Sequence, residues 1–451
     1  MELDIVGLVG ACSYALDCIE AELVHVTNRH GKRVAYISVC MAERLGIEGS
    51  ALQDLAICAM LHDNALTQYI SEEIQENNIS NISLGGSTQG DKNTVVDSGG
   101  MSNESEAIIS ENGMAYSPEI IKSIVGSIHK KIGLHCTYGE QNIKKLPFYT
   151  DVLGAVLYHH ENADGTGTFG KRWDEIPLFA RIIHLCDMVD VMGNSCDFSG
   201  ESWIRAKEYV CRNRNILFDS ECADAFLEVF SEENFVSMSQ DRFEDELWKK
   251  IPRDKRDCDF ETCKGIADFF AGIVDYKSEF TGKHSLGVAK KAAELAEYMG
   301  YSQADIEKFY MAGALHDIGK MAIGNEILEK PGRLTDEEFS RMKNHAGYTY
   351  MILSEVKDFD EVRDWAALHH EKLDGTGYPF GKKAEELNEP ERLMACVDIY
   401  QALTEARPYK SGMSHDKACS ILEDMVQKGW IDAAVTDKLR SCFEVGGRDM
   451  V

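Results

Sequence analysis

The sequence lacks the features of a membrane or exported protein. No apolar run in its 451 residues reaches the roughly 18 residues that a membrane-spanning helix requires. The first residues are acidic rather than basic, so the chain lacks the charged start of a signal peptide. None of its 14 cysteines forms a CxxC pair, which favours reduced thiols over a disulfide framework. These absences predict a cytoplasmic protein with no membrane partner.

Basic residues are also scarce. Lysine and arginine number 47 against 76 aspartates and glutamates, which gives a formal net charge of −29. This balance argues against a partner such as a nucleic acid polymer, which binds broad basic surfaces. A small anionic substrate is compatible with it, because bound divalent cations can reverse the sign of a site locally. An acidic protein that handles phosphates must therefore use metals or a few placed basic side chains.

The sequence does contain an internal repeat, which is marked by the spacing of its histidines. His30 and His62 recur 254 residues later as His284 and His316. The other members recur 210 or 211 residues later, and they are His135/His345, His159/His369, His160/His370 and Asp187/Asp398. A period above 200 residues that occurs only twice is typical of tandem domains rather than of a solenoid. We therefore predict one duplicated unit.

The periodicity of apolar residues is helical almost throughout, and no convincing run of alternating strand residues appears. We predict an all-α fold of two tandem helical bundle domains. The expected divisions are a first domain at 1–235, a connecting helix and linker at 236–264, and a second domain at 265–451. The first copy has 44 extra residues rich in Asn, Ser and Gly, which predict a flexible insertion near 71–115. A capping box at Thr335–Glu338 and a helix end at Gly300 are further local predictions.

The second unit carries a set of metal-ligating side chains. A lone histidine is usually a core or surface residue, but seven candidate ligands in register, twice, make that interpretation improbable. Such a mixed set of nitrogen and oxygen donors exceeds the three or four ligands of one zinc site and suits two or more ions. Iron and manganese fit it well, with zinc and nickel left open. The candidates are His284, His316, Asp317, His345, His369, His370 and Asp398.

Three segments of the second unit resemble the signatures of the HD-GYP branch of the HD phosphohydrolases. They are LHDIGK (315–320), HHEKLDGTGYP (369–379) and DIYQALTEARPYK (398–410). The resemblance covers about 266–410 and, in weaker form, the first unit. It implies an HD-type helical bundle with a bi- or trinuclear centre of iron or manganese. It also implies hydrolysis of cyclic di-GMP, or a related cyclic dinucleotide, to the linear dinucleotide or to mononucleotides.

The resemblance assigns roles to individual residues. The seven candidates above would bind metal, with Asp317 also acting in catalysis. Lys320 would contact the scissile phosphate, and Arg407 and Lys410 would hold phosphates of the substrate. Tyr378, in the DGTGYP turn, is as well explained by a structural loop as by a substrate wall.

The number of metal ions depends on one departure from the family pattern. Trinuclear members carry a carboxylate four residues before the first histidine, where this chain has Phe280. Glu279 is one residue away and could substitute only with a local backbone adjustment. We therefore expect two divalent ions, with a third left open.

The first unit keeps all seven ligand positions but loses the phosphate-handling residues. Leu66 stands in place of Lys320, GTGYPFG shrinks to GTFG (167–170), and no counterpart of ARPYK follows. Three interpretations stay open: a structural or regulatory metal domain, a second hydrolase with another substrate, and retention without metal. The retained residues are His30, His62, Asp63, His135, His159, His160 and Asp187.

Several alternatives to cyclic di-GMP hydrolysis follow from the same residues. One is a cyclic dinucleotide receptor that turns over slowly, which the degenerate first unit would suit. Another is a phosphodiesterase that prefers cyclic GMP-AMP. Hydrolysis of ordinary nucleotides is a third, against which the GYP and ARPYK segments count. The sequence leaves the oligomeric state open, a homodimer included.

Overall fold

The computed structural model has the helical architecture that the sequence predicts, apart from one short strand pair among the residues it describes. In this pair, β1 (Glu2–Leu3) runs antiparallel to β2 (Arg256–Asp257). Strands of two residues are too short to leave a periodic signal in the sequence. The described residues are 1–23, 29–65, 132–194, 198–240, 242–277, 284–328, 330, 332–406 and 411–444. The predicted insertion near 71–115 lies outside them.

The first unit is a bundle built around α2, which packs against α1, α3, α6, α8 and α10. Its elements are α1 (Ile5–Leu23), α2 (His30–Ala42), η1 (Glu43–Leu45), α3 (Ser50–Met60), a helix over 132–143, η2 (Trp173–Glu175), α6 (Leu178–Asn194), α7 (Gly200–Arg212), α8 (Ser220–Val229), α9 (Glu232–Ser237) and α10 (Arg242–Lys250).

The second unit repeats this plan around α12 and α13, which pack closely against each other. Its elements are α11 (Phe260–Lys277), α12 (His284–Tyr298), α13 (Gln303–Leu315), η3 (Ile318–Ala322), α14 (Asn325–Leu328), α15 (Asp336–Ser354), α16 (Asp360–Ala367), η4 (Ala384–Glu386), α17 (Glu389–Thr404), α18 (His415–Gln427) and α19 (Ala433–Glu444).

Local signals in the sequence account for where these helices begin and end. The Thr335 hydroxyl accepts from the N–H of Glu338, and the Glu338 carboxylate accepts from the N–H of Thr335, so α15 starts with the predicted capping box. Helix α12 ends just before Gly300, whose φ of 82° is a left-handed conformation that glycine adopts without strain. Both local predictions are confirmed.

The structure extends the repeat beyond the last predicted ligand. The backbone N–H of Ala163 donates to the carbonyl of Leu217 at 3.0 Å, and the N–H of Leu373 donates to the carbonyl of Trp430 at 3.0 Å. The two carbonyls are 213 residues apart, so the hairpin α7–α8 corresponds to the hairpin α18–α19. The sequence comparison missed this correspondence because no histidine marks it.

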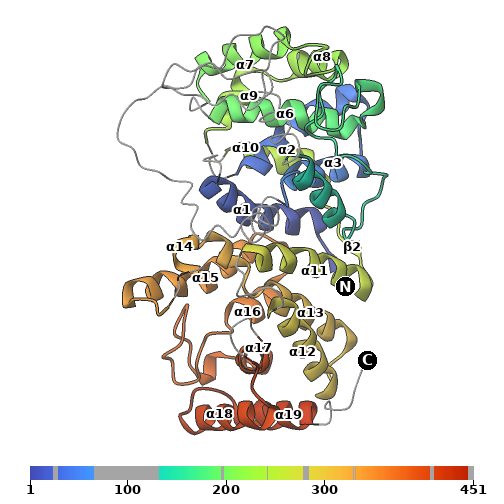
Figure 1. The fold of residues 1–451 in the computed structure, drawn as a ribbon. Helices are drawn as coiled ribbons and strands as arrows, with labels where there is room; N and C mark the ends of the chain where they lie inside the picture. The colour runs from blue at the N-terminus through green and yellow to red at the C-terminus, as the bar shows by residue number, and fades with distance from the viewer. Residues whose placement is uncertain are drawn as a thin grey trace.

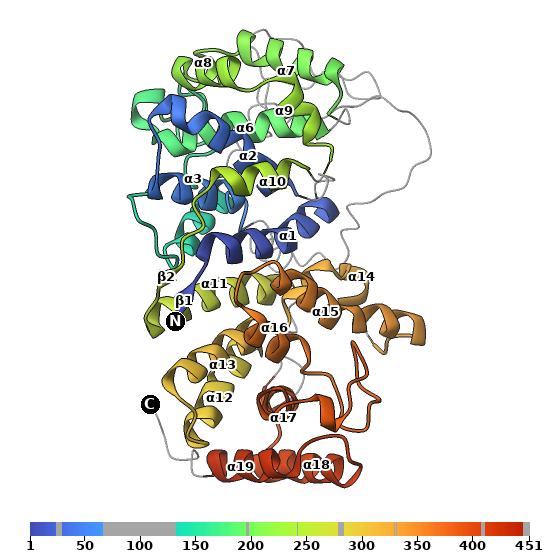
Figure 2. The same ribbon diagram turned by 180° about the vertical axis from the view of Figure 1, so that it is seen from behind.

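The two units lie end to end, with α1 and α11 between them (Figures 1 and 2). Helix α1 of the first unit packs against η3 and α15 of the second. In return, the Arg256 guanidinium donates to the carbonyl of Pro147 at 2.7 Å, and a Cβ on Gly265 would lie 2.8 Å from the carbonyl of Lys145. One buried apolar cluster runs through both units. The units are therefore packed together rather than joined by a free linker.

Most of the cysteines belong to this apolar interior. The cysteines with described side chains carry free thiols, and most of these thiols are buried. In the parts of the chain that the structure describes, no helix combines the length and apolar character needed to cross a bilayer.

Candidate metal centre

The histidine and aspartate of the LHDIGK segment lie at the end of a buried helix. Helix α13 ends just before His316, and Asp317 begins the tight turn η3. A side chain cannot fit at Gly319, because a Cβ there would lie 2.0 Å from the carbonyl oxygen of His345. Thr349 fixes this contact, since its hydroxyl accepts from the N–H of Gly319 at 3.1 Å and donates to the carbonyl of His316 at 2.9 Å. The glycine therefore brings candidate ligands from two helices together.

The structure gathers six of the seven candidate ligands of the second unit into two groups of three, and the seventh, Asp317, lies between them. In the first group, His284 Nε2 lies 3.0 Å and His316 Nε2 lies 3.7 Å from the same oxygen of Asp398. The ligand atoms of each group lie within 4.8 Å of one another. The second group consists of His345, His369 and His370.

Asp317 lies between the two groups. One of its oxygens is 3.1 Å from Nε2 of His316, and the other is 3.4 Å from Nε2 of His345. A carboxylate that offers its two oxygens to neighbouring positions can bridge two ions held side by side. This arrangement would suit a centre that holds more than one ion.

Backbone carbonyls fix the orientation of the imidazoles. In His316, His345 and His369, Nδ1 donates to the carbonyl three residues earlier, at 2.6–2.7 Å. Because a carbonyl can only accept, the proton must lie on Nδ1 and the lone pair on Nε2. Hydrogen bonds of this kind select the tautomer and aim the ligand nitrogen in metal sites.

The atoms aimed at the centre have no partner in the described chain. Nε2 of His316, His345 and His369 and Oδ1 of Asp317 are buried without a hydrogen bond. A buried polar atom left in this state costs about 1–3 kcal/mol. Divalent ions between the two groups would satisfy all four atoms at once. The donor set therefore fits the metal that the sequence predicts.

The ionisation states of His369, His370 and Asp317 also suit metal binding. Burial lowers the pKa of His370 to about 3, and burial together with the neighbouring His370 and His316 holds the pKa of His369 well below its usual value. Burial alone would raise the pKa of Asp317, but His316 and Lys320 outweigh it and hold this pKa well below normal. Neutral imidazoles and ionised carboxylates are the forms that bind metal.

Two of the predicted substrate contacts lie at the edge of this cluster. Lys320 Nζ is 2.5 Å from Oδ2 of Asp317, and its side chain is partly exposed. The ring of Tyr378 lies 4.7 Å from the ring of His370, centroid to centroid. Three other predicted site residues, Glu279, Arg407 and Lys410, lie outside the described residues.

Glu405 is a site residue that the sequence analysis missed. Its carboxylate lies 3.0 Å from Nδ1 of His284, on the opposite side of the ring from Asp398. Burial lowers the pKa of His284, but the two carboxylates outweigh it and raise the pKa to about 10. A carboxylate behind a metal-facing imidazole orients the ring and raises its basicity. An acidic residue two helical turns after Asp398 was the available signal.

The glutamate of the HHE segment shapes the following loop. Glu371 accepts hydrogen bonds from the backbone N–H groups of Phe380, Gly381 and Lys382 at 2.7–3.0 Å. In the first unit, Glu161 does the same for Phe169 and Lys171. Repetition of this glutamate at the histidine offset of 210 was the signal in the sequence, and its role is to fold the loop beside the ligands.

The first unit also brings its candidate ligands together. Asp63 lies 3.2 Å from Nε2 of His135, 3.4 Å from Nε2 of His159 and 3.5 Å from Nε2 of His62. Three of the atoms there, Nε2 of His62 and His159 and Oδ1 of Asp63, are buried without a hydrogen bond. The set is completed by His30, whose Nε2 is 3.4 Å from Asp187, and by His160, whose ring is 4.1 Å from that of His159.

The first unit supports its ligands with different neighbours. Asp190 takes the place of Glu405, since its carboxylate lies 2.7 Å from Nδ1 of His30 and accepts from two nitrogens of Arg33 at 2.6 and 2.9 Å. In the second unit, Gly287 stands at the position of Arg33 and Gln401 at the position of Asp190. The carboxylate behind the histidine is thus itself paired with an arginine in the first unit, whereas the second unit has glycine at the arginine's position.

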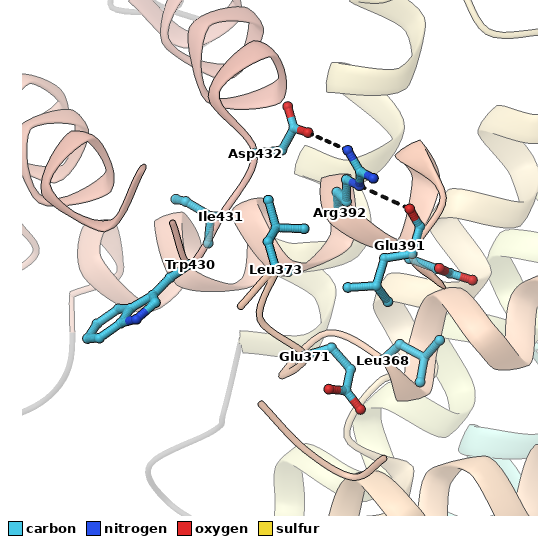
Figure 3. A pocket seen from close by; sticks show the side chains of 10 residues that line it. Leu368, Glu371, Leu373, Glu391, Arg392, Trp430, Ile431 and Asp432 are labelled. Atoms are coloured by element: carbon cyan, nitrogen blue, oxygen red, sulfur yellow. Dashed lines mark hydrogen bonds and ion pairs between the residues drawn. The ribbon is translucent and has the colours of Figure 1, made fainter. Parts of the chain in front are cut away.

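A small cavity of the second unit is lined by residues that include Leu368, Glu371 and Arg392 (Figure 3). Arg392 crosses it, donating to the carbonyl of Leu387 at 3.0 Å and to Asp432 at 2.8 Å. The cavity is lined mainly by apolar side chains, Ala395 among them, and by none of the seven candidate ligands. In the first unit His184 occupies the position of Ala395. This cavity is therefore separate from the candidate metal centre.

Comparison with known proteins assigns the family. The family described as the HD domain matches residues 127–212 and 268–435, which together make up more than half of the chain. The chain belongs to the HD-domain family. The all-α fold of this HD-domain protein is also that of a crystal structure of a cyclic GMP-AMP specific phosphodiesterase from V. cholerae, with a TM-score of 0.62 at 23% identity over 99% of this chain and 98% of the other.

Curated relatives place this HD-domain protein among the cyclic dinucleotide phosphodiesterases. The 3'3'-cGAMP-specific phosphodiesterase 1 of Vibrio cholerae is 32% identical over 67% of this chain and 72% of its own length. The 3'3'-cGAMP-specific phosphodiesterase 3 of the same organism is 32% identical over 70% of this chain and 66% of its own length. A Vibrio cholerae cyclic di-GMP phosphodiesterase is 40% identical over 167 residues, 34% of each chain. The HD-GYP resemblance is confirmed.

Proposed function

We propose that the second unit hydrolyses a cyclic dinucleotide at a centre of two iron or manganese ions. The observation that carries this proposal is the pair of adjacent ligand groups with Asp317 between them. Mixed imidazole and carboxylate donors suit both metals. The names of the curated relatives support the reaction class.

Each residue of the site would have a separate task. When bound, a pair of divalent ions lowers the pKa of a water molecule and neutralises charge on a phosphate. Asp317 would hold the two ion positions in fixed relation through its two oxygens. Lys320, which already contacts Asp317, would add positive charge beside the attacked phosphate. Arg407 and Lys410 would hold the second phosphate, and Tyr378 would form a wall of the site.

Two substrates are each favoured by a specific comparison. Two relatives named for 3'3'-cGAMP match about two thirds of this chain, a length that must include parts of both units. A relative named for cyclic di-GMP matches 34% of the chain at the higher identity of 40%. We propose hydrolysis of both, to the linear dinucleotide or to mononucleotides.

A panel of cyclic dinucleotides tests this proposal. The full chain, loaded with iron or manganese under anaerobic conditions, would be incubated with cyclic di-GMP, 3'3'-cGAMP and cyclic di-AMP, and the products separated by chromatography. We expect metal-dependent hydrolysis of the first two. A protein that holds two ions and cleaves none of the three would contradict the proposal.

We further propose that hydrolysis belongs to the second unit alone. The first unit lacks the counterparts of Lys320, Arg407 and Lys410, and charge-assisted contacts to a phosphate contribute about 1.5–3 kcal/mol each. The paired variants His316→Ala/Asp317→Ala and His62→Ala/Asp63→Ala separate the units. The first pair should abolish hydrolysis and the second should retain most of it. The opposite pattern would make the first unit the enzyme.

A further inference from the structure

A cysteine distinguishes the first unit's cluster from that of the second. Cys136 follows His135 directly in the helix over 132–143, and its side chain is fully buried. At the histidine offset of 210 the second unit has Ala346 in this position. The first unit therefore carries a thiol where the second carries a methyl group.

The thiol lies among the histidine nitrogens. Cys136 Sγ is 3.6 Å from Nε2 of His135 and 3.9 Å from Nδ1 of His159. His160 is the fourth member of this cluster. Each of the four residues has one possible ligand atom that lies within 4.8 Å of those of the other three. In a tetrahedral zinc site, Zn–S is about 2.3 Å and Zn–N about 2.0–2.1 Å, so sulfur and nitrogen ligands lie about 3.5 Å apart. The distance of 3.6 Å from Cys136 Sγ to Nε2 of His135 is close to this value.

A second observation points independently to a ligand at this place. Nε2 of His159 is buried and makes no hydrogen bond to the described chain, while Nδ1 of the same ring donates to the carbonyl of Val156 at 2.6 Å. His159 is fully buried. The carbonyl therefore fixes the tautomer so that the lone pair is on Nε2, which lies 3.4 Å from Oδ1 of Asp63, and a metal ion bound there would satisfy it.

We propose that His135, Cys136, His159 and His160 form a thiolate-containing zinc site. A thiolate is a soft ligand and favours zinc over manganese, whereas the seven candidates of the second unit offer only nitrogen and oxygen. Binding releases the thiol proton to solvent as the Cys136 sulfur joins the metal.

This site would explain how the first unit could keep its ligands without hydrolysing a phosphodiester, as the proposed function requires. Structural zinc sites have four protein ligands, whereas catalytic ones keep an open position for water. An ion held by all four of these residues would have no open position. The two units would then hold different metals for different purposes, one to stabilise the fold and one to cleave.

Cobalt substitution tests the site without depending on activity. The full chain and the variant Cys136→Ala would each be loaded with Co²⁺, and the thiolate-to-cobalt charge-transfer band recorded in the near ultraviolet. Zinc content would be measured in parallel samples. We expect the band in the native chain and in His316→Ala/Asp317→Ala, and its loss in Cys136→Ala with loss of about one zinc ion per chain. Absence of the band in the native chain would overturn the proposal.

Cys186→Ala is the matched control, because this buried cysteine adjoins the first-unit ligand Asp187 while its sulfur lies 3.8 Å from that of Met41. It should keep both the band and the zinc. An equal loss in Cys186→Ala and Cys136→Ala would overturn the assignment. If Cys136→Ala does not fold, alkylation of the native chain decides: Cys136 must react with iodoacetamide only after a chelator removes zinc. A chain that binds zinc through Cys136 but cleaves no cyclic dinucleotide would contradict the proposed function and leave the zinc site standing.

Discussion

His316 in the second unit and His62 in the first occupy the same place at the end of a buried helix, yet the turns that follow are held differently. In the second unit the hydroxyl of Thr349 ties the turn to α15. In the first unit the side-chain amide of Asn64 donates to the carbonyls of Leu61 at 2.8 Å and Gly139 at 3.2 Å. The ligands keep their places while the hydrogen bonds that hold them are exchanged.

This comparison shows which features a metal cluster constrains. All seven ligand positions are kept in both units, at offsets of 254, 210 or 211 residues. The carboxylate behind the first histidine needs only to reach Nδ1, so it comes from Glu405 in one unit and Asp190 in the other. Contacts to substrate are not constrained by the metal, and Lys320 has no counterpart in the first unit.

The largest expected difference is in the free energy of unfolding, between Asp190→Ala in the first unit and Glu405→Ala in the second. Asp190 binds Arg33 as well as His30 and is fully buried, so its removal breaks a buried ion pair. Breaking such a pair costs about 3–5 kcal/mol. Glu405→Ala should instead weaken metal binding in the second unit about 10- to 100-fold with a smaller loss of stability. Chemical denaturation and metal titration would measure the two effects.

Asp190→Asn serves as the control for shape, because it keeps the volume and removes the charge. It should lie between the native chain and Asp190→Ala in stability. Equal unfolding free energies for Asp190→Ala and Glu405→Ala would show that the buried ion pair adds nothing to the first unit.

A smaller difference in stability and metal content is expected between Gly319→Ala and Ala65→Gly. Gly319 and Ala65 occupy equivalent positions in the two units. A Cβ on Gly319 would lie 2.0 Å from the carbonyl of His345, so the turn must move. Overpacking of this kind costs about 1–3 kcal/mol, and it should also displace His345 and lower the metal content. Ala65→Gly should cost about 1 kcal/mol and leave the second unit's metals in place. Thermal unfolding with metal analysis would check both, and equal metal loss would contradict the close contact.

The smallest effect on structure should come from Lys320→Ala. Because Lys320 is proposed to contact phosphate and not metal, we expect hydrolysis to fall about 10- to 100-fold while both ions stay bound. Lys290→Ala removes an exposed charge from α12 and is the control. Steady-state kinetics and metal analysis on the same samples would measure this. Hydrolysis at the native rate in Lys320→Ala would remove Lys320 from the site.

The sequence predicted the helical class, the duplication and the gathering of all fourteen repeated candidate ligands, because periodicity and spacing record these directly. It did not predict Glu405, Asp190 or Cys136, because none of them recurs in the other unit. It also missed the pairing of β1 with β2, which joins residues more than 250 positions apart through two-residue strands. Residues that contact the ligands but differ between the two units cannot be found by comparing the units with each other.

The close approach of Gly319 to α15 limits which substitutions this turn can accept. The second unit pairs Gly319 with Thr349, whereas the first pairs Ala65 with Gly139 at the equivalent positions. A Cβ on Gly139 would lie 2.9 Å from Val156 Cγ1, so the first unit is tight on the opposite side. The atoms that a Cβ on Gly319 would meet first are the backbone carbonyl of His345 and the backbone nitrogen of Thr349, so replacing Thr349 by glycine would not make room for it. The turn of one copy could therefore be exchanged for that of the other only together with the helix that it contacts.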